Sequence, residues 1–259
     1  MSVRWRLIIH GAGRAYDNMA IDEAILRHVA RGRTAQKFPP TLRFYTWDPS
    51  AVSIGYFQGI EQEVDLGACE AEGVDVIRRL TGGGAVFHDR DGEITYSLSI
   101  PDDYPGIPSK VLDSYGVLCE GLVLGFKALG LNAAFKPVND ILVDGKKISG
   151  NAQTRRFGGI LQHGTLLRDV NPQLMFSLLK VPNEKIRDKL IENVEARVTS
   201  ISQEFDAITQ DEVIEAMIHG FEDALDIDCV PGTLTQDERR LAEKIKVDRY
   251  ETDAWNFKR

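Results

Sequence analysis

The sequence predicts an α+β fold with a mixed, largely antiparallel, curved sheet and flanking helices. Segments with strand-like alternation fill most of the first two thirds of the chain, and one long helical segment, Lys110–Leu129, lies among them. Helical segments dominate the last third. Regular alternation of strands and helices would instead predict parallel βαβ units. No linker-like stretch interrupts the chain, so we expect one domain over residues 1–259 with a helical portion from about residue 170.

The expected strands are runs of β-branched and aromatic residues bounded by turn residues. Asp48-Pro49-Ser50 is a turn signal, and we expect it to form a hairpin from the second and third strands. Asp144-Gly145 is a second hairpin signal. In chain order the expected strands are Met1–His10, Leu42–Trp47, Ala51–Tyr56, Val74–Leu80, Ala85–His88, Glu93–Ile100, Asn132–Val143, Lys146–Ala152 and Gly159–Leu167.

The expected helices carry apolar residues at helical spacing, with capping residues at their ends. Asp17 and Asn18 are suitable N-caps for the first helix, and Gly130 is a suitable C-terminal residue for the long helix. The helices are Ile21–Val29, Lys110–Leu129, Gln173–Leu179, Asn183–Asn193, Thr209–Leu225 and Thr235–Lys246.

Composition limits the possible partners and compartments. The net charge of −8 argues against nucleic acid, which needs a basic face, but leaves a nucleotide substrate open. Cys69, Cys119 and Cys229 are scattered without a CxxC pair, as expected in a reducing compartment. No apolar run reaches the ~20 residues that span a membrane, and no signal peptide is evident. We therefore expect a cytoplasmic protein without a membrane partner.

The most unusual stretch runs from Arg78 to Asp89 and reads RRLTGGGAVFHD. Three consecutive glycines, Gly82, Gly83 and Gly84, let backbone N–H groups converge on a ligand. A sharp turn or bulge explains a glycine triplet equally well. The stretch is not a Walker phosphate loop, because no Gly-Lys-Ser/Thr follows.

A second candidate element is the hairpin Asn139–Ala152, which reads NDILVDGKKISGNA. Alternation along the return strand predicts that Lys147 points inward and Lys146 outward. For an arbitrary Lys-Lys pair, a solvated surface is the more common explanation.

The stretch Arg78–Asp89 closely resembles the signature of the lipoate–protein ligase and octanoyltransferase superfamily, which shares its fold with biotin–protein ligases. The hairpin and the run Gln153–Leu167 resemble the same family, and the resemblance covers nearly the whole chain. It implies a lipoate-ligase-like catalytic domain in which the glycine loop wraps the acyl chain. It also implies that no C-terminal accessory domain is present.

The resemblance assigns roles to individual residues. Lys147 matches the family's catalytic lysine, Arg79 lies against acyl group and nucleotide, and Asp140 touches the adenylate. The other residues expected to bind substrate or nucleotide are Thr81, Gly82, Gly83, Gly84, Phe87, His88, Gly150, Ala152 and His163. A lone strand histidine such as His163 is nevertheless more often structural. Adjacent Asp22 and Glu23 diverge by about 100° on a helix, so we expect packing or hydrogen-bonding roles for them.

A lysine suits acyl activation because a carboxylate attacking a phosphate brings two anions together. A compact ammonium between them offsets their repulsion and could also polarise the acyl carbonyl during transfer. These considerations predict that Lys147 acts in both steps.

Two reactions share this scaffold by resemblance. A ligase activates lipoate with ATP and Mg²⁺ as lipoyl-AMP, whereas an octanoyltransferase takes its acyl group from an acyl carrier protein. One transferase branch uses a cysteine shortly before the lysine hairpin, and this chain has none between Cys119 and Cys229. We therefore expect an ATP-dependent lipoate–protein ligase that acts with a separate accessory chain. The expected acceptors are a glycine-cleavage H-like protein or a 2-oxoacid dehydrogenase lipoyl domain.

Other functions remain as alternatives. Asp91–Ser97 and Gln153–Arg155 look more like the cysteine-type transferases, so octanoyl transfer from a carrier protein is the main alternative. A non-catalytic lipoate-binding module is a third, although binding alone would not need an inward cation. A biotin–protein ligase is less favoured, because the Gly-Arg-Gly-Arg loop of that family is absent.

Overall fold

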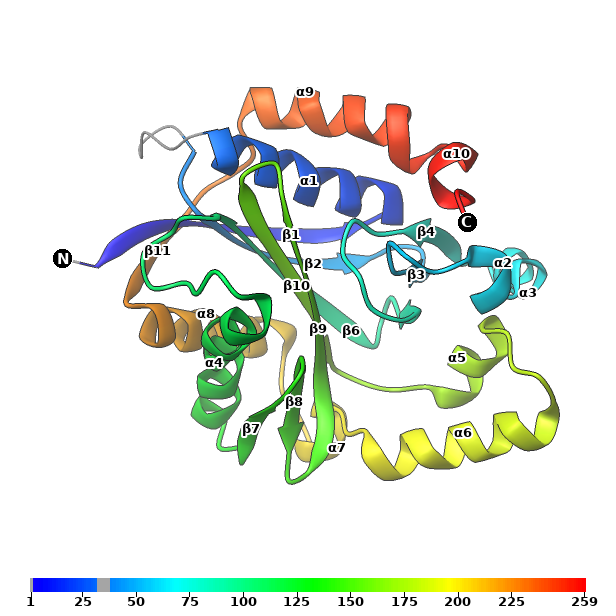
Figure 1. The fold of residues 1–259 in the computed structure, drawn as a ribbon. Coiled ribbons are helices and arrows are strands. Elements are labelled where there is room, and N and C mark those ends of the chain that lie inside the picture. The colour runs from blue at the N-terminus through cyan, green and yellow to red at the C-terminus, as the bar shows by residue number, and fades with distance from the viewer. Residues whose placement is uncertain (1, 32–37) are drawn as a thin grey trace.

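The computed structural model describes residues 2–31 and 38–259, in which an eight-stranded sheet organises the fold (Figure 1). Its strand order is β11-β1-β2-β6-β10-β9-β8-β7. The strands are β1 (Val3–Gly13), β2 (Thr41–Trp47), β6 (Glu93–Pro101), β7 (Ala133–Lys136), β8 (Asp140–Val143), β9 (Lys146–Arg156), β10 (Gly159–Leu167) and β11 (Ile227–Pro231). Met1, expected to begin the first strand, lies outside the described residues.

Strand pairing confirms a mixed, largely antiparallel sheet. β1 pairs in parallel with β2 and β11, and the other neighbours pair antiparallel. The hairpin between β8 and β9 turns at Asp144 and Gly145, whose φ angles of 46° and 85° suit a two-residue hairpin turn. β11 was not expected, because it is a five-residue edge strand that pairs with residues more than 200 positions away.

Helices α4 (Val111–Ala128) and α8 (Gln210–Leu225) cover one face of the sheet (Figure 1). Buried side chains such as Phe44, Tyr96 and Leu98 face them and form the main core. The two helices approach closely where glycines meet, since a Cβ on Gly220 would lie 2.2 Å from the carbonyl oxygen of Gly121. This layer leaves the opposite face of the sheet for α1 and the cavity.

Helix α1 (Ala15–Arg31) lies between the opposite face and α9 (Gln236–Ile245), so its two sides meet different partners. Asp22 accepts hydrogen bonds from Arg43 and Ser97 on the sheet. Glu23 accepts from Arg249 and Tyr250 in the C-terminal segment. The divergence expected for these adjacent acids is confirmed.

A second, three-stranded sheet has the order β4-β3-β5. Its strands are β3 (Ala51–Ile54), β4 (Asp75–Arg78) and β5 (Val86–His88). The expected hairpin between β2 and β3 is therefore wrong. Both edges of β2 are already paired, with β1 and β6, so β3 has no free edge there and pairs with β4 and β5.

An arm of residues 168–200 leaves β10 and returns to β9. It contains α5 (Pro172–Leu178) and α6 (Glu184–Arg197), and no α6 residue is buried. At its end the Thr199 N–H donates to the Lys147 carbonyl oxygen over 2.9 Å. The remaining elements are α2 (Ile60–Glu63), α3 (Leu66–Ala71), α7 (Ile201–Glu204), the π-helix Lys246–Tyr250 and α10 (Asp253–Asn256). Within the described part of the chain, no helix has both the length and the apolar character to cross a membrane.

Candidate active site

A cavity of about 380 Å³ lies on the α1 face of the large sheet, within the range of about 300–1,000 Å³ typical of small-molecule sites. Its floor is formed by β9, β10, β6 and β2, and its walls include the glycine loop, the arm, β5, Ser53 of β3 and Met19 of α1. The predicted residues that line it are Arg79, Gly83, Gly84, Phe87, His88, Lys147, Gly150, Ala152 and His163. Three predicted residues, Thr81, Gly82 and Asp140, lie beside the cavity and contact residues that line it.

Arg79 holds the glycine loop in place. Its guanidinium makes five hydrogen bonds: to Thr81 Oγ1, to the carbonyl and hydroxyl oxygens of Ser53, and to the carbonyl oxygens of Gly82 and Gly84. Burial lowers the Arg79 pKa to about 10. Every N–H of the guanidinium has a partner within the chain, so Arg79 fixes the loop that forms one wall.

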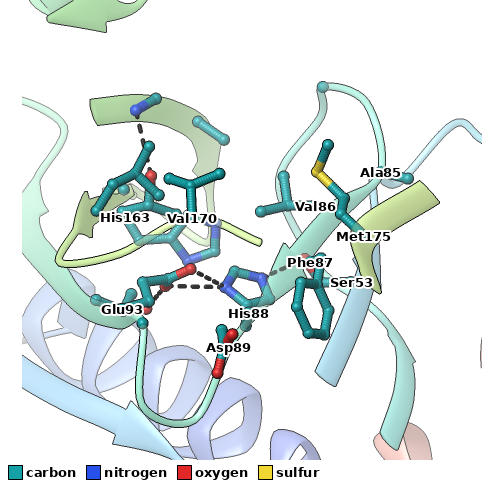
Figure 2. A pocket seen from close by; sticks show the side chains of 18 of the residues that line it. Ser53, Ala85, Val86, Phe87, His88, Asp89, Glu93, His163, Val170 and Met175 are labelled. Atoms are coloured by element: carbon teal, nitrogen blue, oxygen red, sulfur yellow. Dashed lines mark hydrogen bonds and ion pairs between the residues drawn. The ribbon is translucent and has the colours of Figure 1, made fainter. Parts of the chain in front are cut away.

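His88 lies at the bottom of the cavity in a row of polar contacts (Figure 2). Its Nδ1 lies 2.9 Å from Glu93 Oε1, and its Nε2 lies 2.8 Å from Ser53 Oγ. In a neutral ring whose Nδ1–H donates to Glu93, Nε2 accepts from the Ser53 hydroxyl. The imidazole also stacks on Trp47, with 4.1 Å between ring centroids.

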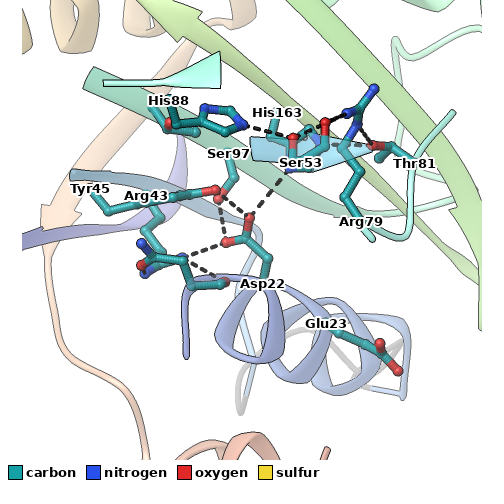
Figure 3. A network of polar contacts seen from close by, with 12 residues as sticks. Asp22, Glu23, Arg43, Tyr45, Ser53, Arg79, Thr81, His88, Ser97 and His163 are labelled. Atoms are coloured by element: carbon teal, nitrogen blue, oxygen red, sulfur yellow. Dashed lines mark hydrogen bonds and ion pairs between the residues drawn. The ribbon is translucent and has the colours of Figure 1, made fainter. Parts of the chain in front are cut away.

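A buried network continues from this row to α1 (Figure 3). His163 Nε2 lies 2.8 Å from Thr81 Oγ1, and its Nδ1 lies 3.6 Å from Asp22 Oδ2. Asp22 and Arg43 form an ion pair of 2.7 Å in which both side chains are 1% exposed. Burial lowers the pKa of His163, although the nearby Asp22 opposes this shift. His163 therefore belongs to the wall's hydrogen-bond network.

Lys147 has a different environment. Its Nζ lies 2.7 Å from Asp140 Oδ1, and the two side chains are 39% and 32% exposed. Lys146 is exposed, as the strand alternation predicts. Lys147 folds back over Gly150, because a Cβ on that glycine would lie 2.8 Å from Nζ. A side chain at position 150 would thus displace the ammonium.

The cavity has a closed end and an open end. Trp47, Ser53 and His88 are at most 6% exposed, whereas Lys147 and Asp140 reach solvent. Trp47 belongs to β2 and Lys147 to β9, three strand spacings away, or about 14 Å at ~4.8 Å per spacing. An octanoyl chain measures roughly 9 Å from carbonyl to methyl, given C–C bonds of about 1.5 Å. This separation is between backbones, and the Trp47 and Lys147 side chains that line the cavity occupy part of it. A ligand of octanoyl length spans the remainder with its tail toward Trp47 and its carbonyl toward Lys147.

The three cysteines all lie in described segments, and none of them lines the cavity. Burial raises the pKa of Cys69 to about 11 and those of Cys119 and Cys229 to about 12. Since the thiolate is the nucleophile, these thiols are poorly suited to accept an acyl group. Across residues 2–31 and 38–259, no cluster of three or more His, Cys, Asp or Glu side chains is placed to hold a metal ion.

Several lining residues were not predicted from the sequence. Ser53 and Trp47 come from strands outside both motifs, and Met175, Val194 and Val198 come from the arm. Glu93 follows the glycine motif closely, but its contact with His88 depends on how the two sheets meet. One signal for Trp47 was available in the sequence. The strand alternation of Leu42–Trp47 places Trp47 on the same face as Tyr45, which would have predicted that both side chains lie on one side of the sheet.

The fold and this cavity define the chain as a protein of the lipoylation class, in which lysines of other proteins are modified. The model of the lipoyl protein ligase A/B catalytic domain matches residues 14–222, and the chain belongs to this family.

The similar proteins fall into two groups. The octanoyltransferase LipM of Kyrpidia tusciae is 40% identical over 98% of this chain and 99% of its own, and that of Bacillus subtilis is 34% identical over 98% of both. Among solved structures, a bi-partite lipoate protein ligase from Thermoplasma acidophilum, studied with its E2 lipoyl domain, is 34% identical with a TM-score of 0.87 and covers 98% of this chain and 96% of its own. A lipoate–protein ligase A bound with ATP is 32% identical with a TM-score of 0.82, covering 99% of both chains.

These relatives correct the expected activity. An ATP-dependent, acyl-adenylate-forming ligase is wrong, because the curated relatives of up to 40% identity over nearly full length are octanoyltransferases. The expectation rested on the missing cysteine, and the relatives instead support octanoyl transfer, which was the main alternative. The expectations of ATP, Mg²⁺ and a separate accessory chain depend on the ligase activity and lose their support with it.

Proposed function

We propose that this protein transfers an octanoyl group from a carrier-protein thioester to a lysine of a lipoyl domain, without ATP. The observation that carries the proposal is the cavity that is closed at one end and has Lys147 at its open end. Such a cavity would hold an eight-carbon chain and leave its carbonyl accessible at the open end. The octanoyltransferase relatives support the octanoyl group as the group transferred. The Thermoplasma ligase described with its E2 lipoyl domain supports the acceptor.

Lys147 acts on the carbonyl in this proposal. The acceptor amine attacks the thioester carbonyl, an amide C–N bond forms, the C–S bond breaks, and the proton lost by the amine ends on the departing thiolate. Negative charge develops on the carbonyl oxygen in the tetrahedral intermediate, and the Lys147 ammonium stabilises it. Asp140 holds Lys147 at the mouth, and its own partial exposure allows the ammonium to exchange it for the substrate oxygen.

The cavity walls have a separate role. Arg79 fixes the glycine loop over the acyl chain, and Val86, Val170 and Met175 provide apolar contacts (Figure 2). Burying an alkyl chain here contributes about 0.8 kcal/mol per methylene, which would hold the donor while the amine approaches.

Intact-mass spectrometry of an unmodified lipoyl domain tests this function. One tube contains octanoyl carrier-protein thioester without ATP, and a second contains octanoate with Mg-ATP. We expect the octanoyl mass increase in the first tube only. An increase that requires ATP, or no increase in either tube, would contradict the proposal.

A further inference from the structure

We propose that the His88 side chain closes the buried end of the cavity and thereby limits the length of the acyl chain that binds. Ser53 and Glu93 position the His88 ring. This inference rests on the proposed acyl transfer and names the residue that selects among donors. It concerns the closed end of the cavity, away from the carbonyl.

The His88 ring is fixed on three sides. Glu93 binds Nδ1, Ser53 binds Nε2, and Trp47 stacks on one face with an interplanar angle of 20°. Ser53 and Glu93 are each 1% exposed, so neither hydrogen bond competes with bulk water. A ring held in this way cannot turn aside for a longer chain without breaking its contact with the buried Glu93 carboxylate, which among the described residues would keep only the hydrogen bond from Thr95 Oγ1.

His88 lies at the buried end of the cavity, where the tail of the acyl chain would end. Val86 and Met175 lie above the imidazole and line the cavity together with it (Figure 2). About three strand spacings separate Lys147 from Trp47, on which His88 stacks. A longer chain would have to displace the ring or pull its carbonyl away from Lys147.

Ser53, His88 and Glu93 have the order of a nucleophile, base and carboxylate, but their location favours a structural wall. Ser53 Oγ also accepts from Arg79 Nη1 at 3.1 Å, so the hydroxyl is held by two neighbours. It lies where the acyl tail reaches, at the end of the cavity opposite Lys147. The tail methyl has no bond that a serine could attack.

Competition between carrier-bound acyl groups of six, eight, ten and twelve carbons tests the inference. His88→Asn shortens the side chain and keeps a donor for Glu93. We expect it to raise the kcat/KM for the ten-carbon donor, relative to that for the eight-carbon donor, by about fifteenfold, since each of the two extra methylenes accommodated is worth about fourfold. Ser53→Ala removes one tether of the ring and should raise the same ratio about threefold.

The matched control is His219→Ala, an exposed histidine on α8, which should leave the ratio unchanged. An equal loss for all chain lengths in both cavity variants would overturn the inference. So would an octanoyl ester found on Ser53 by peptide mapping, or complete loss of transfer in Ser53→Ala. Failure of the wild-type protein to transfer any acyl group would instead contradict the proposed function.

Discussion

Polar side chains at the closed end of the cavity are buried, whereas those at its open end are partly exposed to solvent. The network from Asp22 through His163, Thr81 and Arg79 to His88 is buried. The Lys147–Asp140 pair at the open end is more than 30% exposed on both sides. Buried charges are tolerated only with fixed partners, whereas exposed pairs are weak and exchange partners readily. The difference assigns the shape of the site to the network and its chemistry to the pair.

Removing a charge from the buried network should have the largest effect on stability. Asp22→Ala leaves the Arg43 guanidinium buried without its carboxylate, and we expect the free energy of unfolding to fall by about 3–5 kcal/mol. Urea unfolding measures this change. The control Asp103→Ala removes an exposed acid and should change stability by less than about 0.5 kcal/mol. Equal effects of the two substitutions would erase the contrast between buried and exposed charges.

Removing the cation at the open end should affect rate and spare stability. We expect Lys147→Ala to lower the transfer rate by about 10²–10³, because the carbonyl oxygen loses its stabilising charge. Single-turnover transfer to the lipoyl domain measures the rate, and urea unfolding should show little change. Lys146→Ala is the matched control on the exposed side of the strand. A loss below tenfold would remove Lys147 from the chemistry.

Displacing the same cation without removing it should have a smaller effect. In Gly150→Ala the new methyl group would lie 2.8 Å from Lys147 Nζ and 2.9 Å from its Cε, so the flexible side chain must move. We expect the transfer rate to fall about tenfold with little change in stability, because misplacement of a reacting group by ~1 Å is costly. An unchanged rate would show that the ammonium does not need this position.

The smallest predicted effect is on the pH dependence of stability, and it comes from His10, which lies beside Arg43 of the buried network. Burial and the neighbouring Arg43 lower the pKa of His10 to about 4, against 6.5 ordinarily. The unfolded chain therefore binds a proton that the folded chain does not, and stability is lost as pH falls from about 6.5 towards 4. When the pH falls from 7.5 to 5, the free energy of unfolding of the His10→Gln variant should decrease by about 1 kcal/mol less than that of the wild type, after allowance for solvent screening. Equal losses in urea unfolding would mean that His10 does not contribute.

The sequence predicted best what depends on local geometry. The divergence of Asp22 and Glu23 and the exposure of Lys146 follow from helix and strand periodicity, and both are confirmed. The hairpin predicted between β2 and β3 failed because strand pairing depends on which edges are free in the whole sheet.

Contacts between distant segments could not be read from the sequence. Ser53 reaches His88 across 35 positions, and the arm brings Met175 and Val198 to the cavity from beyond both motifs. The predicted ligase activity was also wrong, because ligases and transferases share one scaffold and a missing cysteine does not distinguish them.

Octanoyl transfer by a chain without cysteines tests the central claim most directly. The measurement is the rate of lipoyl-domain octanoylation from carrier thioester, without ATP, by the variant in which Cys69, Cys119 and Cys229 are all replaced by alanine. We predict a rate within about threefold of wild type, because none of these thiols lines the cavity. Loss of transfer by a variant that still folds would show that a thiol carries the acyl group and would contradict the account.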